Sequence, residues 1–589
     1  MSQSMSRRAF VGSTVGASAM AAVQRQSGAK ADNFLSERYR LTLDRVRKRG
    51  TPAYSRELVL ADAIPNPVRR FTEFSGDVSG RYIGALSCAA ADRHDDYAEL
   101  RALVPELIRL QKPGGYFAAS FAPHGITKED MAVLWGNGRL LIGLLEYARW
   151  SQDADAIAAA KRMGGFLARI APEMNSETVR KQFESGSFAM GYICWTQIIE
   201  GLAELYRVTQ AAEYRQVAEE MAERTVRKPG EHSHGFLSSV RGIMSLFEVT
   251  GERRWLDRAE QEWQGVMESG NVLAPGSIPE AWKPKVRRTE GCAEADWLRL
   301  SLGLWVQTRN LDYLEHAEKT LFNEFCMNQF ATGDFGHRMA GTTGSPIGGN
   351  QEGGGTARAW WCCTLHGLRA FPDAFERVFH SQNEALAYDL PIEGQCAMEG
   401  CTFAAESALE SEAAVRLRVK SASGKAVPLL IREPKWAWGI EVTVNGRHVA
   451  TENEGGYHRL SRSWKTGDVI AIEYRMRTRI ERDPSRTGYV SIWHGPWLLG
   501  VDEALNPFFF DEPLQLNRLR VRVLKEDVVD LERASEGPMH SFAVLQARFR
   551  VSYLPGGYPI TPSSAILRPV AEQTGFETTS WEYWFRLES

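Results

Sequence analysis

The chain has almost no net charge, because 70 lysines and arginines are matched by 73 aspartates and glutamates, which leaves −3 over 589 residues. A nucleic-acid partner or an anionic membrane surface would favour a basic excess, so we expect neither. Past about Ala22 no run is long and apolar enough to span a bilayer. Residues 341–355 hold seven glycines and are typical of a loop, but they contain no Gly-Lys-Ser/Thr, which argues against a phosphate-binding loop.

Cysteine is scarce, and the eight residues fit neither a small disulfide framework nor a zinc-finger array. Two clusters nevertheless stand out, Glu290-Gly-Cys292 and the adjacent pair Cys362-Cys363. Together they offer one carboxylate and three thiols, which suits a four-coordinate zinc site. A zinc-bound cysteine is held as thiolate, its nucleophilic form, so the pattern also indicates covalent catalysis. The alternative is ordinary buried cysteine, which behaves as a small apolar residue.

The N-terminal segment is similar to a twin-arginine export signal. Arg7 and Arg8 lie in Ser-Arg-Arg-Ala-Phe-Val, a mildly apolar stretch follows, and Ala29-Lys30-Ala31 offers a cleavage site. We therefore predict a signal over residues 1–31 and a periplasmic or secreted protein that is free of the membrane once the signal is removed. The alternative is a disordered basic tail.

Residues 32–385 are predicted to form a catalytic domain of helical hairpins. Four segments each carry apolar residues at helical spacing, an aromatic residue near the end and then a short polar turn. They span residues 140–152, 198–210, 239–251 and 298–309. Repeated hairpins bury their faces against their neighbours. Because the spacing varies from about 41 to 59 residues, a closed (α/α) toroid, or barrel, fits better than a regular solenoid.

Residues 386–589 change to a period of two and predict an antiparallel β-sandwich region of one or two units. Val415, Leu417 and Val419 alternate with charged residues, and a later alternating run ends in Asn445-Gly446, a strong hairpin signal. Helices followed by strands indicate separate domains.

Aromatic residues are plentiful. Seventeen tryptophans and seventeen tyrosines offer flat apolar faces with polar edges that suit carbohydrate, although core packing must account for most of them. Trp360 and Trp361 directly precede the cysteine pair. A ring there either stacks on a sugar and excludes water or wedges the start of a helix into the barrel.

Together these features resemble glycoside hydrolase family 127. The resemblance rests on Glu-x-Cys at a helix start, Cys-Cys about 70 residues later, hairpins before, a β-sandwich after, and the stretch GIEVTVNGRHV…GYHRLSRSWKTGDVIAIEY…GYVSIWHGPWLLG. It covers about residues 60–500. Characterised members are β-L-arabinofuranosidases with a zinc-bound cysteine nucleophile, so the resemblance implies a zinc-dependent, retaining hydrolase of plant or microbial glycans.

Carried over position by position, the resemblance implies zinc ligation by the two clusters, with Cys362 as the nucleophile. The general acid and base is a glutamate upstream of Glu-x-Cys, for which Glu280 is the candidate. The match there is loose, because Pro279 stands where glycine is expected. His232 aligns with a sugar-contacting histidine, and His234 takes that role if the register slips.

Two departures from the family alter the predicted sugar cavity. Arg139 and Trp195 stand where the family commonly has histidines in its inner helices. An arginine there would favour an anionic group, such as a uronate carboxylate, through a bidentate pair. Trp361 completes the predicted sugar contacts. His366, three residues after the cysteine pair, is close enough to orient a metal ligand.

Two other functions stay open at this point. Many polysaccharide lyases also combine a toroid with a β-sandwich, and Arg139, His232 and the many tyrosines are compatible with a lyase acting on a uronate-containing glycan. That alternative leaves the clustered cysteines unexplained. The second alternative is a non-catalytic carbohydrate-binding protein with a structural zinc site. The sequence favours no oligomeric state.

Overall fold

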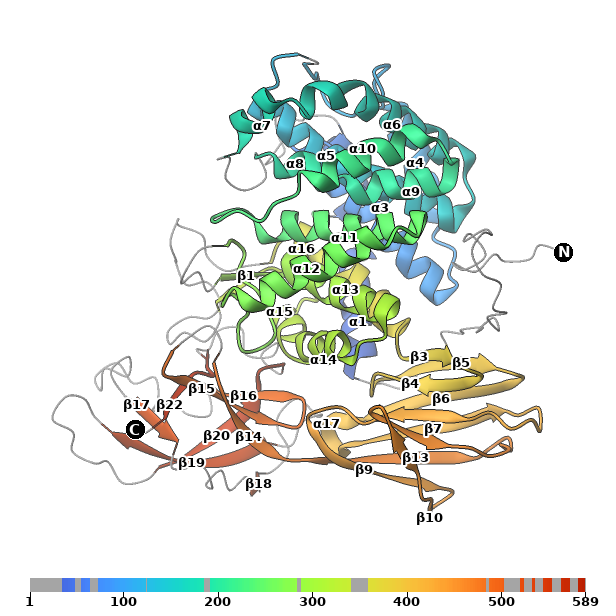
Figure 1. Cartoon of the computed structure of the whole chain (residues 1–589), viewed down its shortest axis with the longest axis vertical. Helices are drawn as coiled ribbons and strands as arrows, with labels where there is room; N and C mark the ends of the chain where they lie inside the picture. The colour runs from blue at the N-terminus through green and yellow to red at the C-terminus, as the bar shows by residue number, and fades with distance from the viewer. Residues whose placement is uncertain are drawn as a thin grey trace.

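A computed structural model describes residues 34–47, 54–63, 73–122, 124–184, 191–282, 288–339, 359–483, 487–502, 520–523, 532–534, 544–552, 563–571 and 581–587. The predicted export signal at residues 1–31 and the glycine-rich segment 341–355 lie outside these residues. A helical domain occupies the upper part of Figure 1, and sheets from the C-terminal part of the chain lie below it. The fold therefore has the predicted order of helices and then strands.

Six helices of the described chain pack side by side in a closed ring, so that the last touches the first. In ring order they are α3 (Asp77–Arg93), α5 (Lys128–Ser151), α9 (Ile199–Thr209), α11 (Ser233–Thr250), α13 (Gly291–Thr308) and α16 (Trp361–Phe375). Each contacts at least one helix of an outer layer. These outer helices are α1 (Phe34–Arg47), α4 (Ala98–Arg109), α6 (Ala154–Met174), α10 (Ala212–Glu223), α12 (Arg253–Glu268) and α14 (Leu311–Thr320). The predicted (α/α) toroid is confirmed.

Shorter elements connect these helices. They are α2 (Arg56–Ala63), α7 (Glu177–Phe183), α8 (Ile193–Thr196), a π-helical turn (Leu321–Phe325), α15 (Cys326–Asn328), β1 (Arg288–Glu290) and β2 (His337–Met339). The two strands pair antiparallel and bring residue 290 opposite residue 337. This small ribbon ends where α13 begins.

The repeated turns predicted from the sequence have a common structural cause. Five inner helices end on a residue in the left-handed conformation, whose N–H bonds to the carbonyl four residues earlier, and four of these residues lie at the predicted turns. These four residues are Gln152, Gln210, Gly251 and Arg309, with φ of 63°, 60°, 72° and 59°. Each ends an inner helix sharply, so the next helix can return along the outside of the ring.

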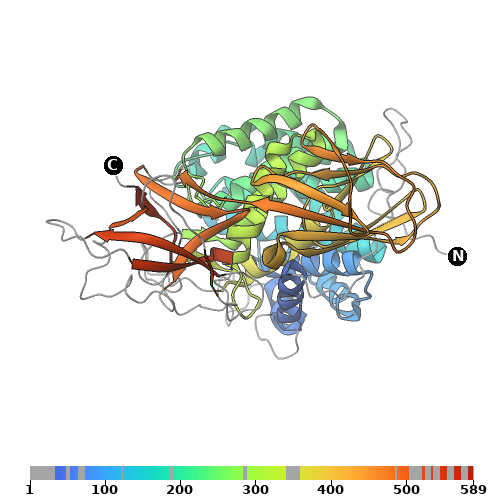
Figure 2. The same cartoon turned by 90° about the horizontal axis from the view of Figure 1, so that it is seen from below.

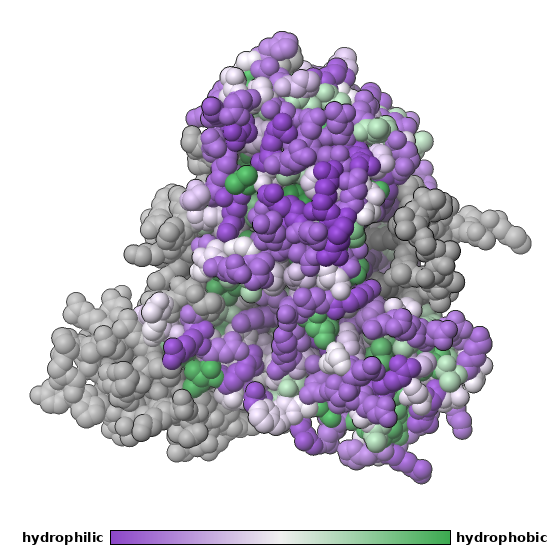
Figure 3. Space-filling view, viewed as in Figure 1, coloured by the Kyte–Doolittle hydropathy of each residue, from purple (hydrophilic) through white to green (hydrophobic). Residues whose placement is uncertain are grey.

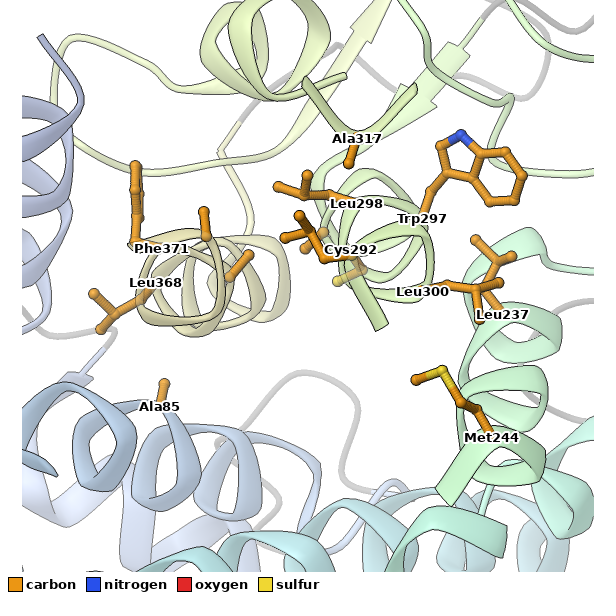
Figure 4. Packing of buried hydrophobic residues seen from close by; sticks show 14 of the residues in the cluster. Ala85, Leu237, Met244, Cys292, Trp297, Leu298, Leu300, Ala317, Leu368 and Phe371 are labelled. Carbon is orange, nitrogen blue, oxygen red and sulfur yellow. The ribbon is translucent and has the colours of Figure 1, made fainter. Parts of the chain in front are cut away.

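The first two inner helices approach closely because glycines line their contact. A Cβ added at Gly80 of α3 would lie 2.3 Å from the carbonyl carbon of Arg139, and one added at Gly143 of α5 would lie 2.2 Å from the carbonyl oxygen of Gly80. This contact sets the places of Arg81 and Arg139, whose side chains enter the ring. Figure 4 shows part of the apolar packing inside the helical domain, with Leu298 and Leu300 on α13 and Leu368 and Phe371 on α16.

Two sheets follow the toroid and form the first β unit. A six-stranded sheet has the order β10-β9-β13-β7-β6-β5, and a five-stranded sheet has the order β11-β12-β8-β4-β3. Trp464 joins them, because its ring packs edge-on against Phe403 and its indole N–H donates to the carbonyl of Val427. Their strands, with a short helix α17 (Leu409–Glu412), are β3 (Phe379–Gln382), β4 (Ala385–Tyr388), β5 (Gly394–Met398), β6 (Cys401–Ala408), β7 (Ala414–Ser421), β8 (Leu429–Arg432), β9 (Ala437–Val444), β10 (Arg447–His448), β11 (Glu452–Glu454), β12 (Tyr457–Leu460) and β13 (Val469–Met476).

A third sheet lies beside the first unit at the lower left of Figure 1. Its strands are β14 (Thr478–Arg482), β15 (Tyr489–His494), β16 (Trp497–Asp502), β17 (Arg520–Val523), β18 (Glu532–Ala534), β19 (Val544–Ser552), β20 (Ser563–Pro569), β21 (Trp581–Glu582) and β22 (Phe585–Leu587). All pairings of named strands in the three sheets are antiparallel except β4–β8 and β17–β22. The hairpin at Asn445-Gly446 connects β9 to β10, as predicted.

The β region begins at Phe379, seven residues before the predicted boundary at residue 386. Both parts of it brace the toroid. Arg432 of β8 is buried and pairs with Glu315 and Glu318 of α14. Asn323 of the π-helical turn bonds to the carbonyl of Pro496, which lies beside the third sheet. Figure 2, seen from below, shows the sheets lying across the helical domain.

Polar residues dominate the molecular face in Figure 3, where apolar residues of the described chain are scattered. No helix among the described residues combines the length and apolar character that crossing a membrane requires.

Candidate active site and metal centre

Two helix N-termini meet at the cysteine clusters. Glu290 ends β1 and directly precedes α13, which places Cys292 in the first turn of that helix. Cys362 and Cys363 lie in the first turn of α16, which packs beside α13 in the ring. A Cβ added at Gly291 would lie only 3.0 Å from the Cβ of Cys363, so the small central residue of Glu-Gly-Cys allows the clusters to meet.

The four ligand atoms lie within 4.8 Å of one another. The Cys292 and Cys363 sulfurs are 3.8 Å apart, and those of Cys362 and Cys363 are 3.9 Å apart. Tetrahedral zinc with Zn–S bonds of about 2.3 Å requires sulfurs roughly 3.8 Å apart. The donor set and its spacing therefore fit a four-coordinate zinc ion.

The three thiols differ in exposure and acidity. Cys292 and Cys363 are fully buried, whereas Cys362 is half-buried. Burial raises the pKa of Cys292 and of Cys363. Hydrogen bonding with the other two thiols lowers the pKa of Cys362 well below its ordinary value. Cys362 is thus the thiol best suited to be an accessible thiolate, and the positive end of the α16 dipole favours the same state.

His232 lies against the carboxylate of the cluster. Its Nε2 is 2.7 Å from Oε2 of Glu290, and it directly precedes α11. Burial alone would lower the pKa of His232, but Glu290 outweighs it, and the pKa is raised. Trp135 of α5 stacks on the His232 ring with centroids 5.9 Å apart. Between the two candidate histidines, His232 and not His234 contacts a predicted metal ligand.

Glu280 lies next to this pair, because one of its carboxylate oxygens is within 4.8 Å of ligand atoms of both His232 and Glu290. Glu280 bonds to Arg288, and its Oε1 is 3.4 Å from Nε2 of His337. Burial alone would raise the pKa of Glu280, but His337 and Arg288 outweigh it and lower the pKa to about 2. The carboxylate is therefore ionised in this geometry.

A closed ring of hydrogen bonds lies behind the cysteines. Arg81 donates from Nη2 to Nε2 of His234 at 3.0 Å and from Nη1 to Nδ1 of His366 at 2.8 Å. Both histidines donate their other N–H to Asp296, at 2.8 and 3.0 Å. Arg81 Nη1 also lies 3.7 Å from the sulfur of Cys292. His366 therefore lies next to Arg81, and Arg81 rather than His366 contacts the candidate metal ligand Cys292.

Arg139 enters this region from α5. Its Nη2 donates to His234 Nε2 at 3.2 Å and to Ser238 Oγ at 3.0 Å, and its guanidinium lies 4.9 Å above the Trp135 ring. Among the described residues no carboxylate is within ion-pair distance of it. Burial and the positive charge of Arg81 lower the pKa of Arg139 to about 10.

The tryptophans near the predicted sugar site differ in burial and in the residues that they contact. Trp195 is fully buried in the core, and its indole N–H donates to Asn175 at 2.8 Å. Trp361 is half-buried at the start of α16 and packs against the core. Trp360 packs edge-on against His337 with centroids 5.6 Å apart. Sugar binding by Trp195 and Trp361 remains a prediction.

Four residues of this region were missed by sequence reasoning: Arg81, Arg288, Asp296 and His337. The spacing of Gly76, which directly precedes α3, and of Gly80 and Gly84 within it is the signal that indicates a close helix contact near Arg81. Nothing comparable in the sequence indicates that Asp296 meets the two histidines.

Comparisons with known proteins agree with this architecture. Residues 57–375 match the sequence profile of the β-L-arabinofuranosidase GH127 catalytic domain, and residues 390–476 match that of the GH127 middle domain. The chain is a glycoside hydrolase. It belongs to glycoside hydrolase family 127. This decides against the lyase and the non-catalytic protein that the sequence alone left open.

Solved structures show the same fold. A GH127 β-L-arabinofuranosidase from Geobacillus stearothermophilus T6 is 16% identical, with a TM-score of 0.70, over 95% of this chain and 100% of that one. A second GH127 β-arabinofuranosidase is 15% identical, with a TM-score of 0.71, over 96% of each chain. A comparison with curated proteins found no match.

Proposed function

We propose that this protein is a zinc-dependent, retaining glycosidase that resembles β-L-arabinofuranosidases and uses Cys362 as nucleophile and Glu280 as acid and base. The observation that carries the proposal is the meeting of three sulfurs and one carboxylate within 4.8 Å at two helix N-termini. The names of the structurally similar enzymes support β-L-arabinofuranosides as the substrate class.

The roles follow from the arrangement of the side chains. When bound to the four ligands, zinc would stabilise thiolate at neutral pH and lower its basicity as a leaving group. The Cys362 thiolate attacks the anomeric carbon, the C–O bond to the leaving group breaks, and Glu280 gives its proton to the departing oxygen. The Glu280 carboxylate then takes a proton from water, whose oxygen attacks the same carbon, and the C–S bond breaks to restore the thiolate.

The first step requires a protonated Glu280, whereas Arg288 and His337 hold it ionised in this structure. We therefore expect bound substrate to weaken the contact of Glu280 with Arg288 or with His337. His232 lies against Glu290 and the stacked Trp135 ring, which supports its proposed contact with the sugar.

Two substitutions test the two roles. We expect Cys362→Ser to abolish turnover, and Glu280→Gln to reduce hydrolysis of glycosides with poor leaving groups by about 10²- to 10⁴-fold. With an activated β-L-arabinofuranoside, Glu280→Gln should accumulate a glycosyl adduct that mass spectrometry of peptides locates on Cys362. Cys194→Ser is the control, because Cys194 is a free cysteine of the same domain that lies outside the cluster. An adduct on another residue, or full activity of Cys362→Ser, would refute the mechanism.

We also propose export through the twin-arginine pathway to the periplasm or the medium. The support is the Arg7-Arg8 motif and the small residues near Ala31. Replacing both arginines by lysine should leave the protein in the cytoplasm of a bacterial host, as measured by cell fractionation. Unchanged export of that variant would contradict the assignment.

A further inference from the structure

We propose that Arg81 is a positioning residue of the metal centre, which binds the Cys292 thiolate from outside the ligand set and strengthens metal binding. The inference rests on the proposed function, in that Glu290, Cys292, Cys362 and Cys363 hold the zinc ion. It concerns a residue of α3, which is remote in sequence from both clusters.

The guanidinium of Arg81 is fixed by its neighbours in the fold. Arg81 is buried, with 7% of its surface exposed. Its Nε donates to Oδ1 of Asp77, one helical turn earlier, at 2.8 Å. Nη2 donates to His234 and Nη1 to His366. Because all three nitrogens have acceptors on different elements, the side chain cannot rotate away from the sulfur of Cys292.

Asp296 determines which nitrogen of each histidine faces Arg81. Asp296 is fully buried and accepts hydrogen bonds from His234 Nδ1 and His366 Nε2. Each neutral imidazole is then a donor towards Asp296 and an acceptor towards Arg81. The remaining lone pair of His366 accepts from Arg81, and that of His234 is shared between Arg81 and Arg139. Because guanidinium N–H groups occupy both lone pairs, His234, His366 and Asp296 form a support for the guanidinium and not a second cation site.

The positive charge of Arg81 compensates the negative charge of the proposed zinc site. A zinc ion with three thiolates and one carboxylate has two positive charges against four negative ones and carries a net charge of −2. A buried anionic cluster is costly unless a nearby cation compensates it. Arg81 supplies such a cation 3.7 Å from the Cys292 sulfur. Hydrogen bonds of this kind to a ligand orient it and favour its metal-bound, deprotonated form.

The arrangement also distinguishes Cys292 from Cys362. The hydrogen bond from Arg81 withdraws charge from the Cys292 sulfur, which disfavours attack by that sulfur. Cys362 is the less buried of the two and stays available for the sugar. Arg81 thus favours Cys292 as a permanent ligand and Cys362 as the reacting sulfur.

Zinc affinity, measured by competition with a chromophoric chelator, tests the inference without any substrate. We expect Arg81→Gln to lower the affinity of the full-length protein for Zn²⁺ by about 10- to 100-fold. Arg432→Gln is the matched control. It also removes a buried, paired guanidinium, but Arg432 pairs with Glu315 and Glu318 and is not part of the cysteine cluster or of the support around Arg81. Its zinc affinity should match the wild type. Thermal melts of both metal-free variants report how much each substitution destabilises the fold.

The outcomes separate the inference from the proposed function. Failure of the wild type to bind Zn²⁺ would overturn both. Wild-type affinity in Arg81→Gln, or an equal loss in Arg432→Gln, would overturn the role of Arg81 alone. If Arg81→Gln does not fold, Arg81→Lys replaces it, because lysine keeps the charge but cannot reach the sulfur and both histidines together. A measurable loss of affinity in Arg81→Lys then supports the inference, and wild-type affinity refutes it.

Discussion

Glu200 offers a quantitative test of the charged interior of the helical ring. It lies on α9, and its Oε1 accepts hydrogen bonds from Arg241 at 2.7 Å and from Arg369 at 3.4 Å. Burial alone would raise the pKa of Glu200, but the arginines outweigh it and lower the pKa from 4.5 to about 2. Each unit of difference between the pKa in the unfolded and folded states corresponds to about 1.4 kcal/mol. The lowered pKa of Glu200 therefore contributes about 3 kcal/mol to the free energy of unfolding.

Glu200→Gln should remove most of this contribution without leaving an arginine unpaired. Arg241 keeps Asp296, and Arg369 keeps Glu146. Because the pKa is lower in the folded state, the contribution is complete above pH 4.5 and is lost as the pH falls towards 2. The wild type should therefore exceed Glu200→Gln by about 3 kcal/mol at pH 7, and the difference should shrink below pH 4.5.

Urea unfolding of the metal-free proteins between pH 7 and pH 3, followed by tryptophan fluorescence, measures this difference. Metal-free protein is needed because acid releases metal from thiolate ligands. Glu177→Gln is the control, since Glu177 pairs with Arg180 in an exposed position where water screens the charges. A stability difference for Glu200→Gln that is negligible at pH 7, or that grows as the pH falls, would refute the reasoning.

Three further predictions concern the site and its support. Gly80→Ala should destabilise the protein by about 1–3 kcal/mol in urea unfolding, because its Cβ would lie 2.3 Å from backbone of α5; wild-type stability would contradict the close contact. Arg139→His should reduce any preference for acidic over neutral synthetic glycosides, measured as the ratio of kcat/KM values, and an unchanged ratio would end the idea of an anionic substrate. Chelation of the metal should lower the melting temperature, and added Zn²⁺ should restore it; identical melts with and without chelator would argue against a metal bound to the folded state.

Much of the fold was predictable because its signals are local. Apolar residues at helical spacing, followed by residues that adopt left-handed turns such as Gln152 and Gln210, indicated the hairpins. Alternating residues before Asn445-Gly446 indicated the strands. Two parallel strand pairs were not predicted, because pairing between β4 and β8 depends on which strands meet in space and not on the pattern within either strand.

The candidate site was predictable where the residue types themselves indicate the chemistry. Thiols and a carboxylate at Glu290, Cys292 and the cysteine pair indicated a common site, and the structure brings them together. Arg81 was not predictable, because a buried arginine resembles a surface arginine until the contact of α3 with α16 is known. Trp195, a position inferred by alignment, lies in the core with its indole N–H bonded to Asn175, and its contact with sugar stays a prediction.

The closure of the helical ring by α16 has a consequence for biosynthesis. The helix that carries Cys362 and Cys363 is the last of the ring to leave the ribosome, and it must dock against α3, the first. A chain that stops before Trp361 therefore lacks Cys362 and Cys363 and cannot complete the four-residue cluster with Glu290 and Cys292.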